Sequence, residues 1–425
     1  MTIVVFVAAL LGAMAIGVPV AFALMFTGVV LMTYMGIFDT QIVAQRMIAG
    51  ANTFTLLAIP FFLLAGELMN AGGLSKRIVD FAIACVGHIR GGLGLVTVIA
   101  AVIMASLSGS AAADTAALAA ILIPMMREAG YNVPRAAGLM GAGGIIAPVI
   151  PPSIAFIIFG VAANVSITGL FMAGIVPGLM MAISLCITWM IVARNENVKP
   201  LPKRSGRERL AATGRAGWAL FMPVIILGGI RFGLFTPTEA AVVAAVYAFF
   251  VGFFIYRELK LKDLYGVMLN AAKTTSVVLF LVAAALVSSW LITSANIPAE
   301  IGGLIQPLID QPKLLLLVIM VLVLVVGTAL DLAPTILILS PVLMPIIREA
   351  GIDPIYFGVL FVMNTCIGLI TPPVGIVLNV VSGVSKVPLG QVIWGILPFL
   401  LAQVTVLLLL IAFPQIVLVP LGYLR

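Results

Sequence analysis

Long apolar stretches separated by short polar segments fill the chain from Thr2 to Leu418. Many of them reach about 18 residues or more, which is long enough for an α-helix to cross a hydrocarbon core of about 30 Å. The pattern predicts an all-α polytopic membrane protein with roughly eleven or twelve crossing helices and about two shorter hairpin-like segments. Glycines and prolines interrupt several stretches, which predicts broken helices at those places.

The composition agrees with this pattern, because 63% of the 425 residues are hydrophobic and only 9% are charged. Soluble proteins carry about 25% charged residues. The first apolar stretch has no lysine or arginine before Arg46. It therefore lacks the basic region of a signal peptide, and we expect it to remain in the protein as a helix.

Much of the net charge of +7 lies in one polar stretch between Arg194 and Arg215. Short loops this basic remain in the cytoplasm. We therefore expect a basic cytoplasmic loop at residues 195–217, which divides the chain into halves of residues 1–194 and 218–425. No aromatic residues or folded domain accompany these charges, so nucleic acid is not an expected partner.

The two halves contain matching passages in the same order. Residues 123–130 read Ile-Pro-Met-Met-Arg-Glu-Ala-Gly, residues 344–351 read Met-Pro-Ile-Ile-Arg-Glu-Ala-Gly, and a Pro-Pro pair follows each at the same distance. Two weaker matches pair residues 17–21 with 235–239 and residues 72–74 with 302–304. This order predicts an internal duplication, and the second copy is inverted if each half crosses the membrane an odd number of times.

Each copy contains a proline pair, Pro151-Pro152 in the first and Pro372-Pro373 in the second. Proline lacks an N–H and displaces a carbonyl from the helix ladder, so a pair ends one half-helix and starts another. Broken backbone at membrane depth is buried in protein or lines a wet cavity. Its carbonyls suit a hard cation such as Na⁺, and the N-terminus of the next half-helix suits an anion. The simpler alternative is a kinked helix that binds nothing.

Two acidic residues lie in stretches of small and polar residues upstream of these breaks. Asp114 follows Ser108, and Asp331 follows Thr328. Close helix packing explains the neighbouring small residues but not the carboxylates, and an intramembrane carboxylate is usually functional. Asp331 is therefore the first candidate ligand, whereas Asp114 either caps a hairpin helix or is a ligand itself.

The other residues that could carry chemistry are few. Cys85, Cys186 and Cys366 lie far apart in apolar sequence, and we expect them to be small apolar core residues. The single histidine, His88, lies in a loop-like Gly-His-Ile-Arg-Gly-Gly segment. The sequence contains no nucleophile motif and no cysteine pair with metal-ligand spacing, so we do not expect an enzyme.

Several motifs resemble those of the large membrane subunit of tripartite ATP-independent periplasmic (TRAP) transporters. They are Gly91–Gly94, Ser108–Ser110, Pro124–Gly130, Pro151–Ser153, Gly233–Ala241 and Thr371–Pro373. The string Phe-Thr-Pro-Thr-Glu-Ala at residues 235–240 is fairly specific. Its Glu239 is expected to stabilise a helix N-terminus, with Thr236 or Thr238 as the cap.

The resemblance implies an elevator-type secondary transporter with two inverted repeats. Members of this family import small organic anions, such as C4-dicarboxylates or sialic acids, together with Na⁺ across the bacterial inner membrane. They work with a small four-helix membrane subunit and with a periplasmic binding protein that delivers the substrate. Because this chain starts with an apolar span and has the length of the large subunit alone, we expect a separate small subunit.

The resemblance also implies where the mobile parts and the sites lie. Re-entrant hairpins are expected near residues 108–132 and 327–352, and broken helices near residues 133–165 and 353–386. The substrate is expected between the hairpin tips, in contact with Ser110, Ser153 and Asp331. Na⁺ is expected where each tip meets a broken helix, first near Ser108, Gly109, Ala147, Ile150 and Pro152, and second near Gly327, Thr328, Gly368, Thr371 and Val374.

Three other functions fit parts of the pattern. A stand-alone Na⁺/organic-anion symporter of the same superfamily would share the hairpins but need no binding protein. An anion channel would share the symmetric broken helices, but its flux would show no saturable dependence on Na⁺. An intramembrane enzyme would need a nucleophile or a metal cluster, which the sequence does not contain.

Overall fold

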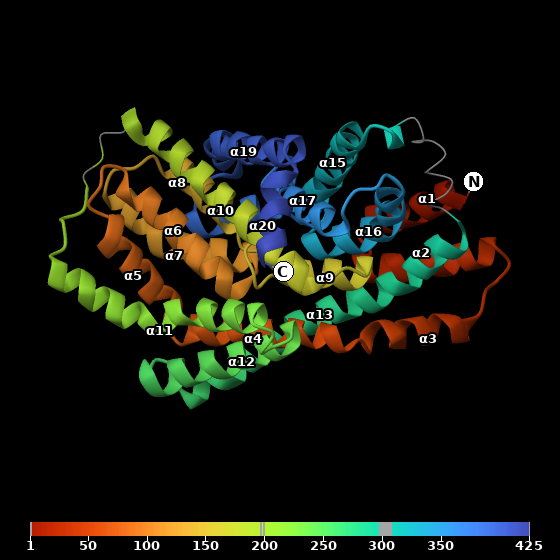
Figure 1. Cartoon of the computed structure of the whole chain (residues 1–425), viewed down its shortest axis with the longest axis horizontal. Helices are drawn as coiled ribbons and strands as arrows, with labels where there is room; N and C mark the ends of the chain where they lie inside the picture. Colours follow the sequence, from red (N-terminus) through yellow and green to blue (C-terminus); the bar gives the residue numbers. More distant parts are fainter. Residues whose placement is uncertain (1, 196–197, 199, 297–307, 425) are drawn as a thin grey trace.

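The computed structural model describes residues 2–195, 198, 200–296 and 308–424, and these residues form helices joined by short connections, without a strand (Figure 1). The first half contains α1 (Thr2–Ala15), α2 (Val20–Tyr34), α3 (Thr40–Ala51), η1 (Phe54–Leu57), α4 (Ala58–Ala71), α5 (Leu74–Val86), α6 (Gly92–Ser108), α7 (Ala111–Glu128), α8 (Val133–Gly144), α9 (Ile154–Ala163), α10 (Ile167–Val192) and η2 (Ala193–Asn195). The second half contains α11 (Gly206–Arg231), α12 (Pro237–Phe250), η3 (Val251–Ile255), α13 (Leu261–Ser294), α15 (Pro312–Ala329), α16 (Leu332–Glu349), α17 (Pro354–Gly368), α18 (Ile376–Ser385), α19 (Leu389–Ala412) and α20 (Gln415–Leu424).

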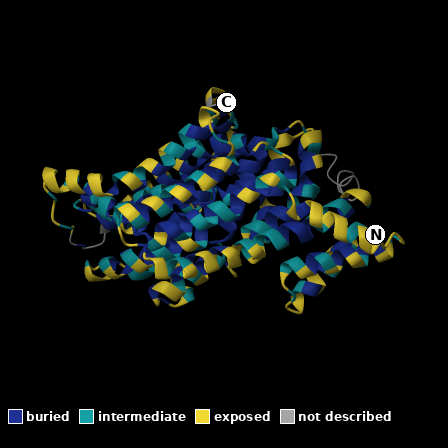
Figure 2. Cartoon of the chain, turned by 90° about the horizontal axis from the view of Figure 1, so that it is seen from below, coloured by how far each residue is buried: buried dark blue, intermediate teal, exposed yellow. Residues whose placement is uncertain are grey.

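The helices have the lengths and composition of a multi-pass membrane protein. Within the described part of the chain, eight helical segments are long and apolar enough to cross a bilayer, and six shorter apolar helices have 10–17 residues. Buried positions concentrate in the middle of the bundle, and exposed ones lie on its outer helices (Figure 2). The all-α prediction is confirmed. The short apolar helices explain why hydropathy alone predicted more crossings.

The first half contains a helical hairpin formed by α6 and α7, with Gly109 and Ser110 at its tip. Both outer ends of the hairpin lie beside the end of α10. The indole nitrogen of Trp189 donates to the carbonyl of Gly91, at 2.8 Å, and Tyr131 stacks on Trp189 with 5.9 Å between ring centroids. The expected segment 108–132 contains the tip and the returning helix, and α6 is the arm that leads into the tip.

The second half contains the corresponding hairpin, formed by α15 and α16 with Leu330 and Asp331 at its tip. Its outer ends lie near the C-terminal end of α19. The amine of Lys313 donates to the carbonyl of Ala412, at 3.0 Å, and the hydroxyl of Tyr356 donates to the carbonyl of Leu410, at 2.8 Å. The expected segment 327–352 again contains the tip and the returning helix.

The two hairpins enter the bundle from opposite ends. Helices α10 and α19 run antiparallel, because Trp189 contacts Phe399 whereas the Gln403 amide donates to the carbonyl of Met181, at 3.2 Å. The first hairpin starts and ends near Trp189, at the C-terminal end of α10. The second hairpin starts and ends at the C-terminal end of α19, which lies at the other end of α10.

A broken helix follows each hairpin. Helices α8 and α9 are separated by residues 145–153, and α17 and α18 are separated by residues 369–375. The pairs Pro151-Pro152 and Pro372-Pro373 lie in these breaks, each joined by a cis peptide bond. The missing proline N–H groups explain why neither helix continues.

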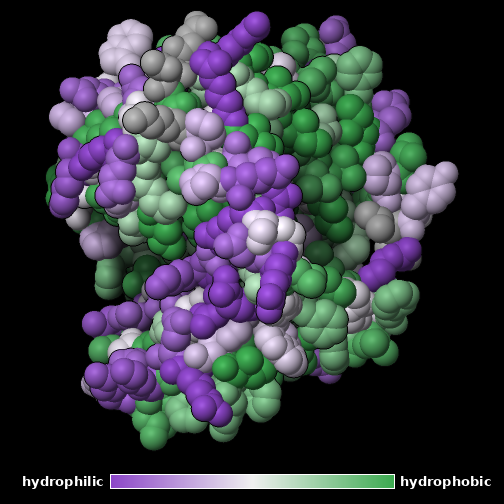
Figure 3. Space-filling view, turned by 90° about the vertical axis from the view of Figure 1, so that its left-hand side faces the viewer, coloured by the Kyte–Doolittle hydropathy of each residue, from purple (hydrophilic) through white to green (hydrophobic). Residues whose placement is uncertain are grey.

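The basic segment between α10 and α11 is shorter than the loop expected at residues 195–217, because α11 starts at Gly206. Ser205 and Glu208 form a capping box that starts this helix. Asp80 on α5 accepts hydrogen bonds from Arg204, at 2.9 Å, and from Arg215, at 3.2 Å, and so ties the segment to the bundle. Hydrophilic residues gather at this end of the molecule (Figure 3).

The start of α12 confirms the role expected for Glu239. Thr236 and Glu239 form a capping box in which the Thr236 hydroxyl accepts from the Glu239 N–H, at 3.3 Å, and the Glu239 carboxylate accepts from the Thr236 N–H, at 2.8 Å. Residues 302–304, which the sequence pairs with residues 72–74 of the first half, lie outside the described residues.

The long helix α13 forms a wall beside the hairpins. It packs against α2, α3 and α4 and also against α16 of the second hairpin. Helices α4 and α13 are therefore the outer helices that lie next to the central part of the bundle, where the two hairpin tips lie.

Candidate functional site

A cavity of about 150 Å³ lies between the two hairpin tips. Most of its walls come from the hairpins and the broken helices, and α4 and α13 supply the rest. The residues that line it are Leu63, Gly109, Ser110, Ala111, Ala112, Ile154, Ala155, Ile158, Thr274, Val278, Asp331, Leu332, Ala333, Leu369, Ile376 and Val377.

Helix N-termini converge on this cavity. Among the described residues, the first two residues of α7, α9, α16 and α18 all line it, namely Ala111 and Ala112, Ile154 and Ala155, Leu332 and Ala333, and Ile376 and Val377. The first N–H groups of a helix have no partner within the helix, and its N-terminus carries roughly half a positive elementary charge. The described lining contains no lysine, arginine or histidine. Any attraction for an anion in the cavity therefore comes from these helix N-termini rather than from basic side chains of the lining.

Three polar side chains belong to the lining, Ser110, Asp331 and Thr274. Ser110 is the N-cap of α7 and accepts from the Ala113 N–H, at 3.4 Å. Asp331 is the N-cap of α16 and accepts from the Leu332 N–H, at 2.8 Å. The structure thus brings together two of the three residues predicted to contact substrate.

Ser153, the third predicted substrate residue, does not line the cavity. It is fully buried as the N-cap of α9. Its hydroxyl donates to the carbonyl of Pro148 and accepts from the Phe156 N–H, at 3.2 Å. The Ser153 hydroxyl therefore both donates and accepts within the protein. It caps the start of α9, whose first turn lines the cavity.

The first predicted cation set is brought together around the tip of hairpin one. Gly109 has a φ of +63°, and a Cβ on it would lie 3.1 Å from the carbonyl oxygen of Pro152. Ala147, Ile150 and Pro152 are buried in the break between α8 and α9. The backbone of the tip therefore lies directly against the backbone of the break, with Ser108 on the other side of Gly109.

Asp114 lies beside this set, in the first turn of α7. It is not the helix cap, since that place belongs to Ser110. Its carboxylate accepts from the hydroxyl of Ser108, and its second oxygen is buried without a hydrogen-bond partner among the described residues. The side chain is 1% exposed. Asp114 therefore places one buried carboxylate oxygen without a described hydrogen-bond partner beside the tip.

The second predicted cation set lies where hairpin two meets the break after α17. A Cβ on Gly368 would lie 2.6 Å from the carbonyl carbon of Gly327, so α15 and α17 touch through backbone at this point. The Gly375 N–H donates to the carbonyl of Thr328, at 3.3 Å. Tip and break are thus joined directly in the second half as well.

The last two members of the second set lie within the break. The Thr371 hydroxyl donates to the carbonyl of Ile367, at 2.8 Å, and the carbonyl of Val374 accepts from the Asn379 amide, at 3.0 Å. Val374 is 42% exposed, whereas residues 145–153 of the first break are buried. The second set is therefore the more open of the two.

The described residues contain no group of three or more His, Cys, Asp or Glu side chains that could hold a metal ion. Cys366 is buried, and Cys85 and Cys186 are half-buried. Carbonyl and hydroxyl oxygens are the ligands that both tip regions offer. Such oxygens suit a hard monovalent cation such as Na⁺.

Sequence reasoning missed two features of the site. It did not place Thr274 of α13 in the lining, because nothing in a uniformly apolar helix marks the face that meets a distant hairpin. It also did not foresee that the helices following both tips and both breaks would point their N-termini into one cavity. The proline pairs marked the starts of the two half-helices after the breaks, but the convergence of all four N-termini depends on tertiary packing.

Comparison with known proteins adds to this geometry. The family described as "Tripartite ATP-independent periplasmic transporter, DctM component" matches residues 7–416 of the chain. The 2,3-diketo-L-gulonate TRAP transporter large permease protein YiaN of Escherichia coli (strain K12) is 56% identical over 425 residues, covering 100% of both chains.

Two further relatives match most of this chain. The C4-dicarboxylate TRAP transporter large permease protein DctM of Pseudomonas aeruginosa is 42% identical and covers 88% of this chain and 87% of its own. The sialic acid TRAP transporter large permease protein SiaM of Vibrio cholerae is 40% identical and covers 95% of both.

The fold also has a counterpart among solved structures. The Alcanivorax borkumensis YdaH transporter superposes with a TM-score of 0.62, covering 90% of this chain and 89% of that chain. Only 15% of the aligned residues are identical. At this identity the likeness establishes the fold alone.

Proposed function

Because the chain belongs to the DctM component family of tripartite ATP-independent periplasmic transporters and is a multi-pass protein of the bacterial inner membrane, we propose that it imports a small organic carboxylate coupled to Na⁺. The observation that carries this proposal is the convergence of the N-termini of α7, α9, α16 and α18 on the cavity between the hairpin tips. These N-termini offer their positive dipole ends, and those first-turn N–H groups that no cap residue occupies, to an anion.

Asp331 gives the cavity a second kind of recognition. A carboxylate side chain repels an anionic group, but it accepts hydrogen bonds from hydroxyl groups elsewhere on the same substrate. The substrate's carboxylate is therefore oriented toward the helix N-termini, and a hydroxyl-bearing carbon is oriented toward Asp331. Ser110, at the other tip, donates or accepts according to the substrate.

Two Na⁺ ions fit the two places where a tip touches a break. Gly109 meets Pro152 at the first place, and Gly327 meets Gly368 at the second. Each contact can tighten around a cation held by carbonyl oxygens. Coupling follows if Na⁺ favours the arrangement of tips that also binds the carboxylate, because a ligand shifts a conformational equilibrium only by its differential affinity.

An elevator movement suits the composition of the cavity wall. Leu63 of α4 and Thr274 and Val278 of α13 form the wall of outer helices, and the other lining residues belong to the hairpins and the broken helices. Sliding the second group past the first would open the same site to either side of the membrane. Entry of the two hairpins from opposite ends supports two inverted repeats as the origin of this arrangement.

The names of the relatives guide the choice of substrate and partners. They name 2,3-diketo-L-gulonate, sialic acid and C4-dicarboxylates, all of which carry a carboxylate. We infer a sugar acid of the first kind as the leading substrate, because that relative shares 56% of its residues with this chain. A small membrane subunit and a periplasmic binding protein complete the transporter under this proposal.

Uptake in proteoliposomes tests the proposed function. The vesicles hold this chain and its small-subunit neighbour, and a panel of radiolabelled organic acids is supplied with and without the binding protein and an inward Na⁺ gradient. The proposal predicts uptake that requires both. Uptake driven by Na⁺ without the binding protein would identify a stand-alone symporter, and flux that needs neither would identify a channel.

A further inference from the structure

Two arginines make the same contact at equivalent positions of the two repeats. Arg127, in the last turn of α7, donates to the carbonyl of Ser385, at 3.0 Å. Arg348, in the last turn of α16, donates to the carbonyl of Ala163, at 3.1 Å. Each arginine belongs to the returning helix of one hairpin, and each acceptor belongs to the half-helix that follows the break in the other half of the chain.

Both acceptors are the last residues of their helices. Ser385 ends α18 and Ala163 ends α9, and the residues after them, Lys386 and Asn164, have φ of +59° and +52°. The final carbonyls of a helix have no partner within it and form its negative pole. A guanidinium placed there makes a charge-assisted hydrogen bond, which is stronger than a neutral one. Each arginine therefore joins a hairpin helix to a half-helix through a charge-assisted hydrogen bond.

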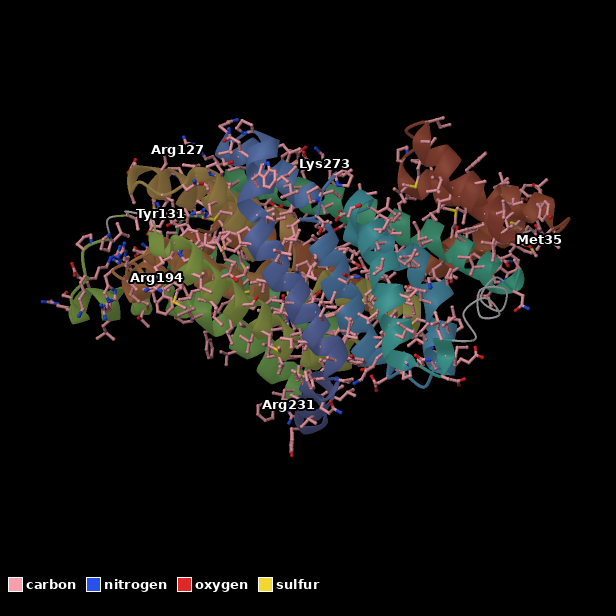
Figure 4. The ribbon with its side chains drawn as sticks, turned by 90° about the horizontal axis from the view of Figure 1, so that it is seen from above. Met35, Arg127, Tyr131, Arg194, Arg231 and Lys273 are labelled. Atoms are coloured by element: carbon pink, nitrogen blue, oxygen red, sulfur yellow. The ribbon has the colours of Figure 1, made fainter. Side chains whose placement is uncertain are left out.

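The two fastened pairs are also the helices that surround the cavity. Helix α7 packs along α18, and α16 packs along α9, and the N-termini of all four line the cavity. Each pair thus meets at the cavity through its N-termini and is fastened at its far end by one arginine. Arg127 lies at the same end of the molecule as Tyr131 and Arg194, and Met35 lies at the opposite end (Figure 4).

This arrangement connects the two candidate cation sites. Helix α7 starts at the tip of the first site, and α18 starts at the break of the second site, so Arg127 joins an arm of one site to an arm of the other. Arg348 does the same through α16, which starts at the second tip, and α9, which starts at the first break. The two hydrogen bonds therefore join each hairpin to the half-helix that follows the break of the other site.

We propose that Arg127 and Arg348 are positioning residues that couple the two Na⁺ sites, so that a cation at one site favours binding at the other. The inference rests on the proposed Na⁺ coupling of transport. It assigns cooperativity between the sites to two hydrogen bonds that lie at the far ends of the helices from the cavity. Neither arginine lines the cavity, so substrate contact is not part of their role.

The Na⁺ dependence of the purified protein tests the inference. The variants are Arg127→Gln and Arg348→Gln, which remove the positive charge, with Arg127→Lys and Arg348→Lys as conservative changes that keep it. Arg231→Gln is a matched control, because Arg231 also donates to a carbonyl, that of Tyr423, at 2.7 Å, but between α11 and α20, which do not line the cavity. The thermal midpoint in detergent is recorded against Na⁺ concentration, together with Na⁺-dependent uptake.

The inference predicts a Hill coefficient above one for the wild type. In each Gln variant it falls toward one, and the half-saturating Na⁺ concentration rises by about fivefold or more, while the Lys variants lie between. Arg231→Gln keeps the wild-type curve. A merely structural role would lower the midpoint without changing the Hill coefficient. If one Gln variant does not yield folded protein, its mirror variant in the other repeat tests the same claim.

Two outcomes overturn the inference and are distinguishable from each other. Folded Gln variants that keep the wild-type Hill coefficient and half-saturation would remove the arginines from site coupling and leave the proposed function standing. A wild-type protein whose midpoint and uptake do not respond to Na⁺ at all would overturn the proposed Na⁺ coupling, and the inference with it.

Discussion

Ser110 and Asp331 occupy equivalent places in the two hairpins. Each is the N-cap of the helix that returns from a hairpin tip, and each faces the same central cavity. A cap residue is fixed by the helix that it starts, so its side chain is held in place before substrate arrives. The two tips therefore present a hydroxyl and a carboxylate from opposite sides of one site.

The first prediction concerns the carboxylate. Asp331→Ala removes the acceptor for substrate hydroxyls and should lower uptake at least about tenfold, since hydrogen bonds to charged groups contribute about 1.5–3 kcal/mol. Asp353→Ala is the matched control, because Asp353 caps α17 with hydrogen bonds to Ile355 and Tyr356 but does not line the cavity. Both variants should insert into the membrane. Equal uptake by the two would remove Asp331 from the site.

The second prediction separates two serines that look alike in the sequence. Ser110→Ala should raise the substrate concentration for half-maximal uptake by about two- to tenfold, the worth of one hydrogen bond. Ser153→Ala should leave that concentration unchanged and lower the stability of the protein by about 1 kcal/mol, because it removes a buried cap that does not face the cavity. Uptake kinetics and thermal unfolding, measured on both variants, check the two outcomes. A reversed pattern would move Ser153 into the substrate site.

The third prediction addresses the second cation site through glycine. A Cβ on Gly368 would lie 2.6 Å from the Gly327 backbone, so Gly368→Ala pushes α15 away from α17. The half-saturating Na⁺ concentration should rise by about tenfold, the size expected from overpacking a close contact. Gly383→Ala is the control, since a Cβ there meets nothing within 4 Å. Wild-type Na⁺ dependence in Gly368→Ala would separate this contact from cation binding.

The fourth prediction tests the broken backbone itself. Pro152→Ala or Pro373→Ala restores an N–H that can rejoin the helix ladder and occupy a carbonyl that is otherwise free. Either change should raise the half-saturating Na⁺ concentration several-fold in the uptake assay. Pro177→Ala serves as the comparison, because Pro177 lies within the continuous helix α10. Unaltered Na⁺ affinity in both break variants would contradict the idea that free carbonyls bind the cation.

Local signals in the sequence predicted much of the fold. The proline pairs predicted the two breaks within a few residues, and Glu239 predicted the start of α12, because short-range capping decides where a helix begins. Asp331 was predicted as a ligand, and its place as the N-cap of α16 was not anticipated. The capping box at Ser205 was not anticipated in a stretch expected to be loop, so the start of α11 was missed. The hairpin expected at residues 108–132 left out its first arm, α6, since hydropathy does not distinguish a crossing helix from an arm of a hairpin.

The site could be predicted only in part. Ser110 and Asp331 line the cavity between the tips, whereas the Ser153 hydroxyl is used inside the protein to start α9. Contact of these residues with substrate stays a prediction. Na⁺ binding by the two groups of residues around the hairpin tips stays a prediction. Arg127 and Arg348 were recognised as a repeated motif, yet their bonds to Ser385 and Ala163 join parts of the chain that no local pattern connects.

The central claim is that a carboxylate binds at the converging N-termini of α7, α9, α16 and α18. A structure of the transporter determined with Na⁺ and a transported organic acid tests it most directly. The claim predicts that the carboxylate oxygens lie within hydrogen-bond distance of first-turn N–H groups from these helices, with a substrate hydroxyl on Asp331. A carboxylate held by a lysine or arginine side chain, or bound outside the space between the tips, would contradict it.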